Sequence, residues 1–272
     1  MIFYSNKKNM LNHFENKGFF VIKNFFSKKE ISYAKKEIFQ YSKIFFNKRI
    51  KYSENNFDYY IKNTLNKKNN FSSKFYDLSK KFISMNNMVF NKKIIDLGRK
   101  ILKTENIGIL NRAYGYRMDR PKNKKFLTQL HQDYVQNLGA PEGIVFYSSL
   151  RNVDQKSGPV VIYQGSHKLG LLNIKLNKKE KNYSRSLILN VNKSSLNKNY
   201  KKIYLKIKSR DLAVFDFLLL HESSPNKSND IRWSLISRFF SFNSTIGKKN
   251  MFCGGNQEGN RFENIHPEKM IW

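Results

Sequence analysis

The residues best suited to chemistry lie in the segment Leu130-His131-Gln132-Asp133. In an extended segment residues i and i+2 point to the same side, so the imidazole of His131 and the carboxylate of Asp133 would converge. His221 is the candidate for a third ligand from elsewhere in the chain. Two histidines and one carboxylate suit a non-haem Fe(II) that keeps other coordination positions open for oxygen chemistry. One such match is weak support by itself, so the hypothesis depends on the rest of the chain.

A second group of polar residues lies at the ends of two apolar runs. His221 follows the run 212–220, so we expect a strand to end there and its side chain to reach a rim. Arg232 starts the run 232–242, and a hairpin would bring it close to His221. Its guanidinium can bind a carboxylate of a dicarboxylate cosubstrate through two hydrogen bonds, and the alternative is a surface salt bridge. Arg238 is a second choice for this role, but six residues along a strand is about 20 Å, which is too far.

The formal charge of +31 admits nucleic acid, an anionic membrane or an acidic substrate as partners. Lysine far outnumbers arginine, and the Lys-Lys pairs are scattered along the chain. Lys, Asn and Ile are all abundant and share A/T-rich codons, so a genome bias explains the charge without a polyanion. We therefore expect no nucleic-acid partner, although the charge favours an anionic small molecule as substrate.

Membrane and secretion signals are missing from the sequence. It holds no apolar run of about 18 residues, which predicts no membrane span. Residues 1–16 lack the apolar centre of a secretory signal. The single cysteine, Cys253, rules out an internal disulfide framework and fits a reducing cytoplasm. The oligomeric state is not determined by the sequence.

The first 105 residues are expected to be mostly helical. After an apolar run at 18–26, Ser27 and Glu30 form the pattern of a capping box and predict a helix over 28–45. The tyrosine-rich stretch 48–70 fits a loop, a broken helix or a lid. A further helical pattern covers 73–102, with one break expected near Asn86-Asn87.

From residue 107 on, short apolar runs alternate with turn residues, which predicts an antiparallel sandwich or barrel. The polar stretch 175–202 fits an insertion or a long loop. We expect one domain, with a helical layer over 1–105, a β core over 106–245 and a C-terminal extension over 246–272. The expected strands are 107–118, 126–130, 143–150, 160–163, 186–191, 203–207, 212–220 and 232–242.

Three segments in this order resemble the phytanoyl-CoA dioxygenase family of Fe(II)/2-oxoglutarate-dependent oxygenases. They are His131-x-Asp133, the segment 157–168 with Gly-Pro followed by Gly-Ser-His-Lys, and His221-x-Ser223 followed by Asn226-x-Ser228 and Arg232. The opening segment 18–31 also resembles the first strand and capped helix of the family. The likeness therefore spans most of the chain. Gln164 departs from a proline that relatives often carry before Gly-Ser-His.

The resemblance implies a mainly β fold, a double-stranded β-helix (jelly roll) with a helical N-terminal layer. It implies Fe(II), 2-oxoglutarate and O2 as cofactor and cosubstrates. The implied site residues are His131, Asp133 and His221 as iron ligands, Arg232 as the clamp for the far carboxylate of 2-oxoglutarate, Ser223 beside it, and Tyr147 lining the cosubstrate pocket.

The resemblance also implies the reaction class, oxidation of a C–H bond with release of succinate and CO2. Halogenating relatives lack the carboxylate of the His-x-Asp segment, so Asp133 favours hydroxylation, or a related desaturation or ring closure. The substrate is a small molecule that these motifs do not identify. The candidates for substrate contact are Tyr114, Tyr116, Arg117 and Gln129, with 48–70 as a lid.

Two alternatives stay open. One is a jelly-roll protein that has lost catalysis and only binds a ligand, and the other is a basic nucleic-acid-binding protein, against which the scattered lysines count. Among the other histidines, we expect His167 to hold a turn and His13 to lie on a surface helix. His266 and the Cys253-Gly254-Gly255 segment have no assigned role.

Overall fold

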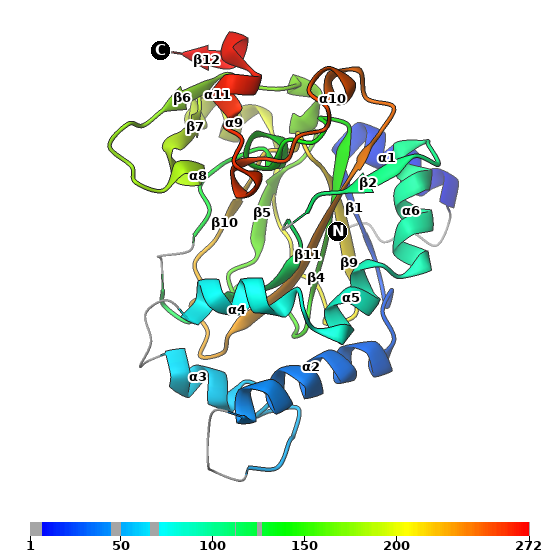
Figure 1. Cartoon of the computed structure of the whole chain (residues 1–272), viewed down its shortest axis with the longest axis vertical. Helices are drawn as coiled ribbons and strands as arrows, with labels where there is room; N and C mark the ends of the chain where they lie inside the picture. Colours follow the sequence, from blue (N-terminus) through cyan, green and yellow to red (C-terminus); the bar gives the residue numbers. More distant parts are fainter. Residues whose placement is uncertain (1–6, 45–49, 66–70, 112, 124–126, 272) are drawn as a thin grey trace.

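The computed structural model describes residues 7–44, 50–65, 71–111, 113–123 and 127–271 (Figure 1). Its helices are α1 (Lys7–Lys17), α2 (Lys28–Lys43), α3 (Tyr59–Leu65), α4 (Phe71–Ser79), α5 (Ile83–Val89), α6 (Lys92–Leu102), α7 (Asp133–Asn137), α8 (Tyr183–Ser186), α9 (Lys193–Asn199), α10 (Thr245–Lys249) and α11 (Phe262–Ile265). Its strands are β1 (Phe19–Ile22), β2 (Ile107–Ile109), β3 (Gly115–Asp119), β4 (Gly143–Ser149), β5 (Val160–Tyr163), β6 (Ile174–Leu176), β7 (Leu187–Leu189), β8 (Lys202–Tyr204), β9 (Leu212–Asp216), β10 (His221–Ser223), β11 (Arg232–Ser241) and β12 (Met270–Ile271). Short 3-10 helices are η1 (Ser166–Leu169), η2 (Asn256–Glu258) and η3 (Pro267–Lys269).

Two antiparallel sheets form the centre of the fold. The larger sheet has the order β1-β9-β4-β11-β2, with β3 also paired to β11, and the smaller sheet has the order β10-β5-β8. Val145 and Phe215 of the larger sheet pack in one apolar cluster with Val160 and Ile162 of the smaller sheet. The two sheets therefore face each other, and the jelly roll expected from the sequence is confirmed.

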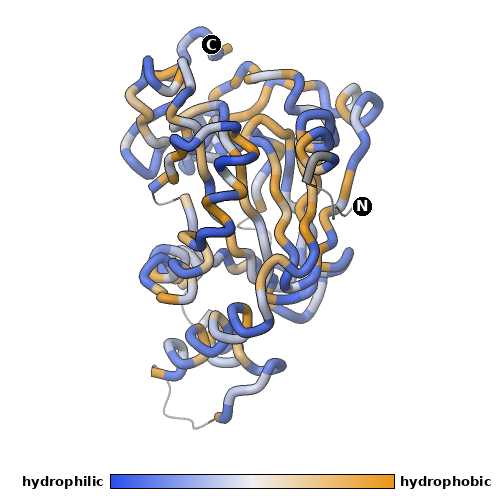
Figure 2. Tube along the Cα trace, turned by 90° about the vertical axis from the view of Figure 1, so that its right-hand side faces the viewer, coloured by the Kyte–Doolittle hydropathy of each residue, from blue (hydrophilic) through white to orange (hydrophobic). Residues whose placement is uncertain are grey.

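The larger sheet is covered on its other face by the N-terminal helices. Every residue of β4 is buried, because Ile144 and Phe146 pack against the helical layer while Val145 and Tyr147 face the smaller sheet. Burial on both faces explains why this strand reads as a continuous apolar run. Figure 2 shows the same arrangement, with apolar residues concentrated along the central strands.

The helical layer follows the sequence patterns at its start and departs from them later. The capping box is present, since Ser27 accepts a hydrogen bond from the Glu30 amide and Glu30 accepts one from the Ser27 amide. The break expected near Asn86-Asn87 is wrong, because both residues lie inside α5. The side-chain amide of Asn86 donates to the Lys80 and Phe82 carbonyls, so it stabilises the turn that precedes this helix.

Several expected strands are corrected by the sheet registers. The run 107–118 is two strands, β2 and β3, which pair with different parts of β11. The run 126–130 begins outside the described residues, and its described part is not a strand. The run 212–220 ends as a strand at Asp216, and the chain then crosses to the smaller sheet, where His221 begins β10 rather than a loop.

The polar stretch 175–202 is folded rather than a long loop. It carries α8, β7 and α9, and β6 pairs with β7 on one side and with the C-terminal β12 on the other. These elements lie together at one end of the molecule (Figure 1). Within the part of the chain that is described, no helix is long and apolar enough to cross a membrane.

Candidate active site

The structure brings the three candidate metal ligands together. His131 and His221 form a backbone bridge, with N–O distances of 3.0 and 3.1 Å, which ties the His-x-Asp segment to the start of β10. Their ring centroids lie 4.1 Å apart. His221 Nε2 lies 3.5 Å from Asp133 Oδ2. One ligand atom from each of the three side chains lies within 4.8 Å of the others.

Both imidazoles are oriented by the backbone. Nδ1 of His131 lies 2.8 Å from the Gln129 carbonyl oxygen, and Nδ1 of His221 lies 2.9 Å from the Leu219 carbonyl oxygen. A carbonyl can only accept, so each Nδ1 carries the proton and each Nε2 presents its lone pair. Gln132, between the two ligands, points away and binds the Gly170 and Leu218 carbonyls.

The carboxylate of Asp133 has one occupied and one open oxygen. Oδ1 accepts from Nε and Nη2 of Arg238, both at 2.9 Å, and from Asn137 Nδ2 at 3.1 Å. Oδ2 is buried and has no hydrogen-bond partner among the described residues. A buried carboxylate oxygen is rarely left unsatisfied, and a cation held with the two Nε2 atoms would satisfy it. The N, N, O donor set therefore fits a divalent iron.

The position of Arg238 contradicts the expectation that this residue lies too far from the site. That expectation holds only if the site lies beside Arg232, at the start of β11. Instead Asp133 lies further along, opposite Arg238. Because residues at even spacing point to one side of a strand, Arg232, Ser234, Ile236 and Arg238 all face the same cavity. That alternation was the available sequence signal.

Burial and neighbouring charges keep the ligand set deprotonated. Burial and the neighbouring His221 lower the pKa of His131 to about 3. Burial also lowers the pKa of His221. Burial alone would raise the pKa of Asp133, but Arg238 and the two histidines hold it below its ordinary value. At neutral pH the site thus offers two neutral imidazoles and one carboxylate, the forms that bind a metal.

These shifts predict a pH-dependent stability of the metal-free protein. Unfolded histidine titrates near pH 6.5, well above folded His131, so the unfolded chain binds the extra proton first as the pH falls. Stability should therefore decrease below about pH 6.5, by up to about 1.4 kcal/mol per pH unit for one such histidine. Urea unfolding with EDTA at pH 7.5 and 5.0 measures this, and His131→Gln should lessen the decrease. An unchanged slope in His131→Gln would contradict the assignment.

Arg232 lines the same cavity as the three candidate ligands, a space of about 100 Å³. The hairpin expected between His221 and Arg232 is not formed, because β10 and β11 belong to different sheets. Arg232 donates to Asp119 Oδ2 through Nε at 3.2 Å and Nη2 at 2.8 Å, while its buried Nη1 has no partner among the described residues. Ser223 and Tyr147 also line this cavity, and Tyr147 Oη accepts a hydrogen bond from Ser234 at 3.2 Å.

A larger cavity of about 960 Å³ shares His131 and Arg238 with the smaller one. Its outer walls include residues of α4 and α8, which lie on the same side of the molecule in Figure 1. Of the expected substrate contacts, Tyr114, Arg117 and Gln129 line it. Tyr116 does not, because it is buried in the helical layer beside Ser84. The described part of 48–70 does not line it either, whereas Tyr76 of α4 does and was missed.

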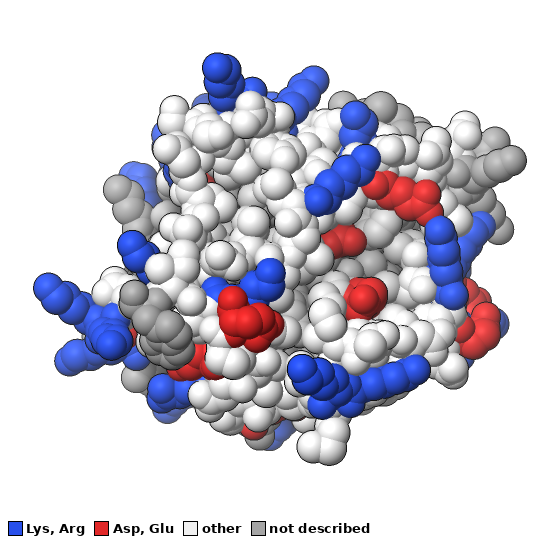
Figure 3. Space-filling view, turned by 90° about the horizontal axis from the view of Figure 1, so that it is seen from above, with Lys and Arg blue, Asp and Glu red and all other residues white. Residues whose placement is uncertain are grey.

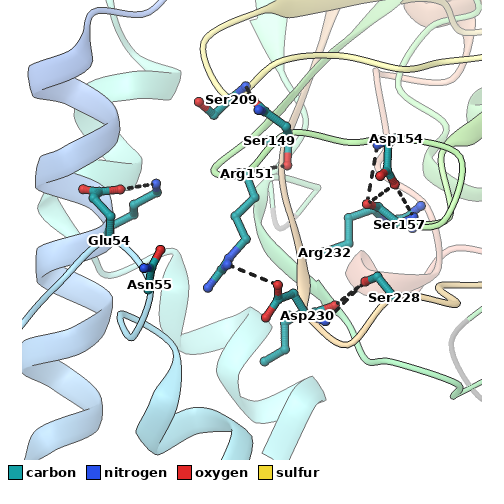
Figure 4. A pocket seen from close by; sticks show the side chains of 13 residues that line it. Glu54, Asn55, Ser149, Arg151, Asp154, Ser157, Ser209, Ser228, Asp230 and Arg232 are labelled. Atoms are coloured by element: carbon teal, nitrogen blue, oxygen red, sulfur yellow. Dashed lines mark hydrogen bonds and ion pairs between the residues drawn. The ribbon is translucent and has the colours of Figure 1, made fainter.

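Figure 4 shows a polar cavity of about 430 Å³ beside the first residues of β11, which shares Arg232 with the smaller cavity. Arg151 points toward Asp230, with Nη1 at 3.6 Å from its carboxylate, and its Nη2 lies 3.1 Å from Asp58. On the opposite wall Lys35 pairs with Glu54 at 2.5 Å. The Arg151 pairs connect Asp58 of the helical layer with Asp230, which lies two residues before Arg232. We assign this cavity a structural role.

The C-terminal segment packs behind α7, which begins with Asp133. Gly139 donates to the Cys253 carbonyl at 2.8 Å, and Leu138 forms a bridge with Gly254. His266 is buried and lies 2.7 Å from the Tyr134 hydroxyl. These contacts give the Cys253-Gly254-Gly255 segment and His266 a structural role. His167, as expected, holds a turn, with Nε2 at 3.1 Å from the Glu15 carbonyl oxygen.

Several solved structures share this fold. The epimerase SnoN, in complex with Fe3+, alpha ketoglutarate and nogalamycin RO, is 11% identical with a TM-score of 0.61 and covers 86% of this chain and 83% of its own. EvdO2 from Micromonospora carbonacea var. aurantiaca, complexed with 2-oxoglutarate, is 13% identical, with a TM-score of 0.59 and coverage of 88% and 93%. EctD from S. alaskensis, with 2-oxoglutarate and 5-hydroxyectoine, is 15% identical, with a TM-score of 0.59 and coverage of 89% and 79%. The shared fold is the jelly roll of the 2-oxoglutarate-dependent oxygenases.

The family follows from the sequence itself. The profile of the phytanoyl-CoA dioxygenase family matches residues 14–234, so this chain belongs to that family. The resemblance inferred from three short segments is therefore confirmed. A search of curated protein sequences gave no match.

Proposed function

We propose that this protein is an Fe(II)/2-oxoglutarate-dependent dioxygenase that hydroxylates a C–H bond of a small anionic molecule, with release of succinate and CO2. The observation that carries the proposal is the open, buried Oδ2 of Asp133 beside the Nε2 atoms of two histidines. Family membership supports the same class of chemistry.

In this proposal His131, Asp133 and His221 hold the iron, and Arg232 and Ser223 bind the far carboxylate of the cosubstrate. Bound iron would supply activation of O2, with two electrons coming from the oxidative decarboxylation of 2-oxoglutarate and two from the C–H bond of the substrate. A carboxylate partner for Arg232 is supported by its Nη1, a buried charged donor that has no hydrogen-bond partner among the residues described. Tyr147 lies on the same inner sheet face, and the apolar side chains of Val145, Phe215 and Ile236 limit water in the cavity.

Hydroxylation is the proposed reaction because Asp133 occupies the position that a halide would need. The fold by itself does not select it, since an epimerase, SnoN, and a carbocyclase, SnoK, share the architecture. Once a substrate is found, the mass of the product distinguishes hydroxylation from these other reactions. Hydroxylation adds one oxygen atom, epimerisation leaves the mass unchanged, and ring closure or desaturation removes two hydrogens.

The larger cavity supports a polar small molecule as substrate. Its described walls carry Lys80, Lys81 and Arg185, and one acidic side chain, Asp77. On the face drawn in Figure 3, Lys and Arg are dispersed, and Asp and Glu lie between them, both in its hollowed part and around it. The described residues of this face therefore form no continuous basic path for nucleic acid. A single cysteine is typical of proteins in a reducing compartment, so we propose a cytoplasmic location.

An anaerobic titration tests the proposal. Adding Fe(II) and then 2-oxoglutarate to the purified protein should produce a visible metal-to-ligand charge-transfer band. His221→Ala should abolish the band because one ligand is lost, and Arg232→Ala should shift it to much higher 2-oxoglutarate concentrations. His167→Ala and Arg99→Ala are matched controls outside the two cavities and should retain it. A folded wild type without any band would favour the alternative, a jelly-roll protein that binds a ligand without catalysis.

A further inference from the structure

Asp119, the last residue of β3, is shared by two arginines. Its Oδ1 accepts from Arg117 Nε at 3.1 Å and Nη2 at 2.9 Å. Its Oδ2 accepts from Arg232 Nε at 3.2 Å and Nη2 at 2.8 Å. The carboxylate is thus held on both sides by a guanidinium, and the three groups form a chain of charge-assisted hydrogen bonds.

The strand register places these groups on one face. Asp119 is paired with Arg232 across β3 and β11, and Arg117 is paired with Ser234. Residues two apart on a strand share a face, so Arg117 and Asp119 both point to the interior. The Arg232 side chain is 2% exposed and that of Asp119 is 7%, whereas that of Arg117 is 25% exposed. The Arg117–Asp119–Arg232 chain of hydrogen bonds therefore runs from a partly exposed residue, Arg117, to a buried one, Arg232.

The Arg117–Asp119–Arg232 chain of hydrogen bonds connects the larger cavity with the smaller one. Arg117 lines the larger cavity, where we place the substrate, and it also reaches the smaller one. Arg232 lines the smaller cavity, where we place the cosubstrate. The groups sum to one positive charge, since two guanidinium groups offset one carboxylate. That charge matches one carboxylate of 2-oxoglutarate.

Asp119 also fixes which donor of Arg232 stays available. It engages Nε and Nη2, so Nη1 is the guanidinium nitrogen that is held in a fixed orientation without a partner among the described residues. Without Asp119, the buried guanidinium would lose its orientation and its neutralising partner. Arg117 in turn holds the other oxygen of Asp119 and so limits rotation of the carboxylate.

We propose that Asp119 is a positioning residue for 2-oxoglutarate and that the chain Arg117–Asp119–Arg232 couples the substrate cavity to cosubstrate binding. This inference rests on the proposed function of the site. A ligand that contacts Arg117 would change the orientation of Asp119 and thereby the affinity of Arg232 for the cosubstrate. Since such coupling is reciprocal, bound cosubstrate would favour the same ligand equally.

The test is an anaerobic 2-oxoglutarate titration of the Fe(II)-loaded full-length protein, followed by the charge-transfer band. Asp119→Asn should weaken 2-oxoglutarate binding by about thirtyfold or more, because a buried charge pair is broken. Arg117→Gln should weaken it by about three- to tenfold. The double variant should bind no more weakly than Asp119→Asn alone. Fe(II) affinity should stay within about twofold of wild type, which also reports that the variants are folded.

The control is Arg99→Gln, which removes an arginine that pairs with Glu105 on the surface and lines neither cavity. It should leave the titration unchanged. Absence of a band in the wild type would overturn the proposed function itself. A wild-type band with unchanged 2-oxoglutarate affinity in Asp119→Asn would overturn only the positioning role.

Additive effects in the double variant would overturn the coupling, because Arg117 would then act on the cosubstrate directly. If Asp119→Asn does not fold, Arg117→Gln tests the proposal in its place, because Arg117 is partly exposed and its replacement should be tolerated. Weakened 2-oxoglutarate binding with intact Fe(II) affinity supports the chain, and unchanged binding overturns it.

Discussion

Replacing Asp133 with alanine should abolish the charge-transfer band and all 2-oxoglutarate-dependent oxidation. Asp133 supplies the carboxylate oxygen among the three converging ligand atoms, and this oxygen has no hydrogen-bond partner in the described part of the chain. Loss of outer-shell partners of a metal site costs roughly 10–100-fold in affinity, and loss of a direct ligand should cost more. Anaerobic Fe(II) titration and succinate release measure the two effects.

The alanine variant also leaves Arg238 buried without its carboxylate, so a control for folding is needed. Asp133→Asn has the same shape and can still accept the Arg238 hydrogen bonds through its carbonyl oxygen. Its amide nitrogen would take the place of Oδ2 and cannot bind iron in that form. We expect Asp133→Asn to unfold near the wild-type temperature without metal and to bind no Fe(II). Full activity in either variant would remove Asp133 from the ligand set.

Replacing Arg238 with glutamine should weaken Fe(II) binding by about 10–100-fold while leaving the three ligands in place. Arg238 and Asn137 occupy Oδ1 of Asp133 and thereby leave Oδ2 for the metal. Without the guanidinium the carboxylate can rotate, and either oxygen can face the site. Arg238 Nη1 also donates to the Ala113 carbonyl at 2.8 Å, which fixes the guanidinium against the neighbouring chain.

The Arg238→Lys variant tests whether the charge of Arg238 or its hydrogen-bond geometry supports Fe(II) binding. Lysine keeps the positive charge but lacks the planar fork that binds one oxygen through two donors. An affinity between those of the wild type and Arg238→Gln would support a positioning role. Activity of Arg238→Gln should recover at saturating Fe(II), because the ligands themselves are intact. Wild-type Fe(II) affinity in the glutamine variant would contradict the role.

Local patterns in the sequence were sufficient for features that depend on a few neighbouring residues. The capping box of Ser27 and Glu30 is formed as expected, because its hydrogen bonds span three residues. The strand at 160–163 has the expected bounds. The spacing of His131 and Asp133 places both side chains at one point, together with His221.

Errors arose where one element depends on another that is distant in sequence. The run 212–220 is uniformly apolar, yet its strand ends at Asp216 because the chain must cross to the second sheet to pair His221 with β5. The apolar pattern is the same in a strand and in a buried crossing. The break in the helical layer was misplaced for a similar reason, since Asn86 binds carbonyls of the preceding turn.

The sequence by itself determined the family, because three short motifs in a fixed order carry the resemblance, and the resemblance in turn implied the jelly roll. It also supplied the three side chains that converge as candidate ligands. Only the tertiary structure decided that Arg238 supports Asp133 and that Asp119 links Arg117 to Arg232. Both arrangements depend on the register between strands and on how far β11 extends past the candidate ligands. Register is set by the packing of whole sheets, which no short stretch of sequence specifies.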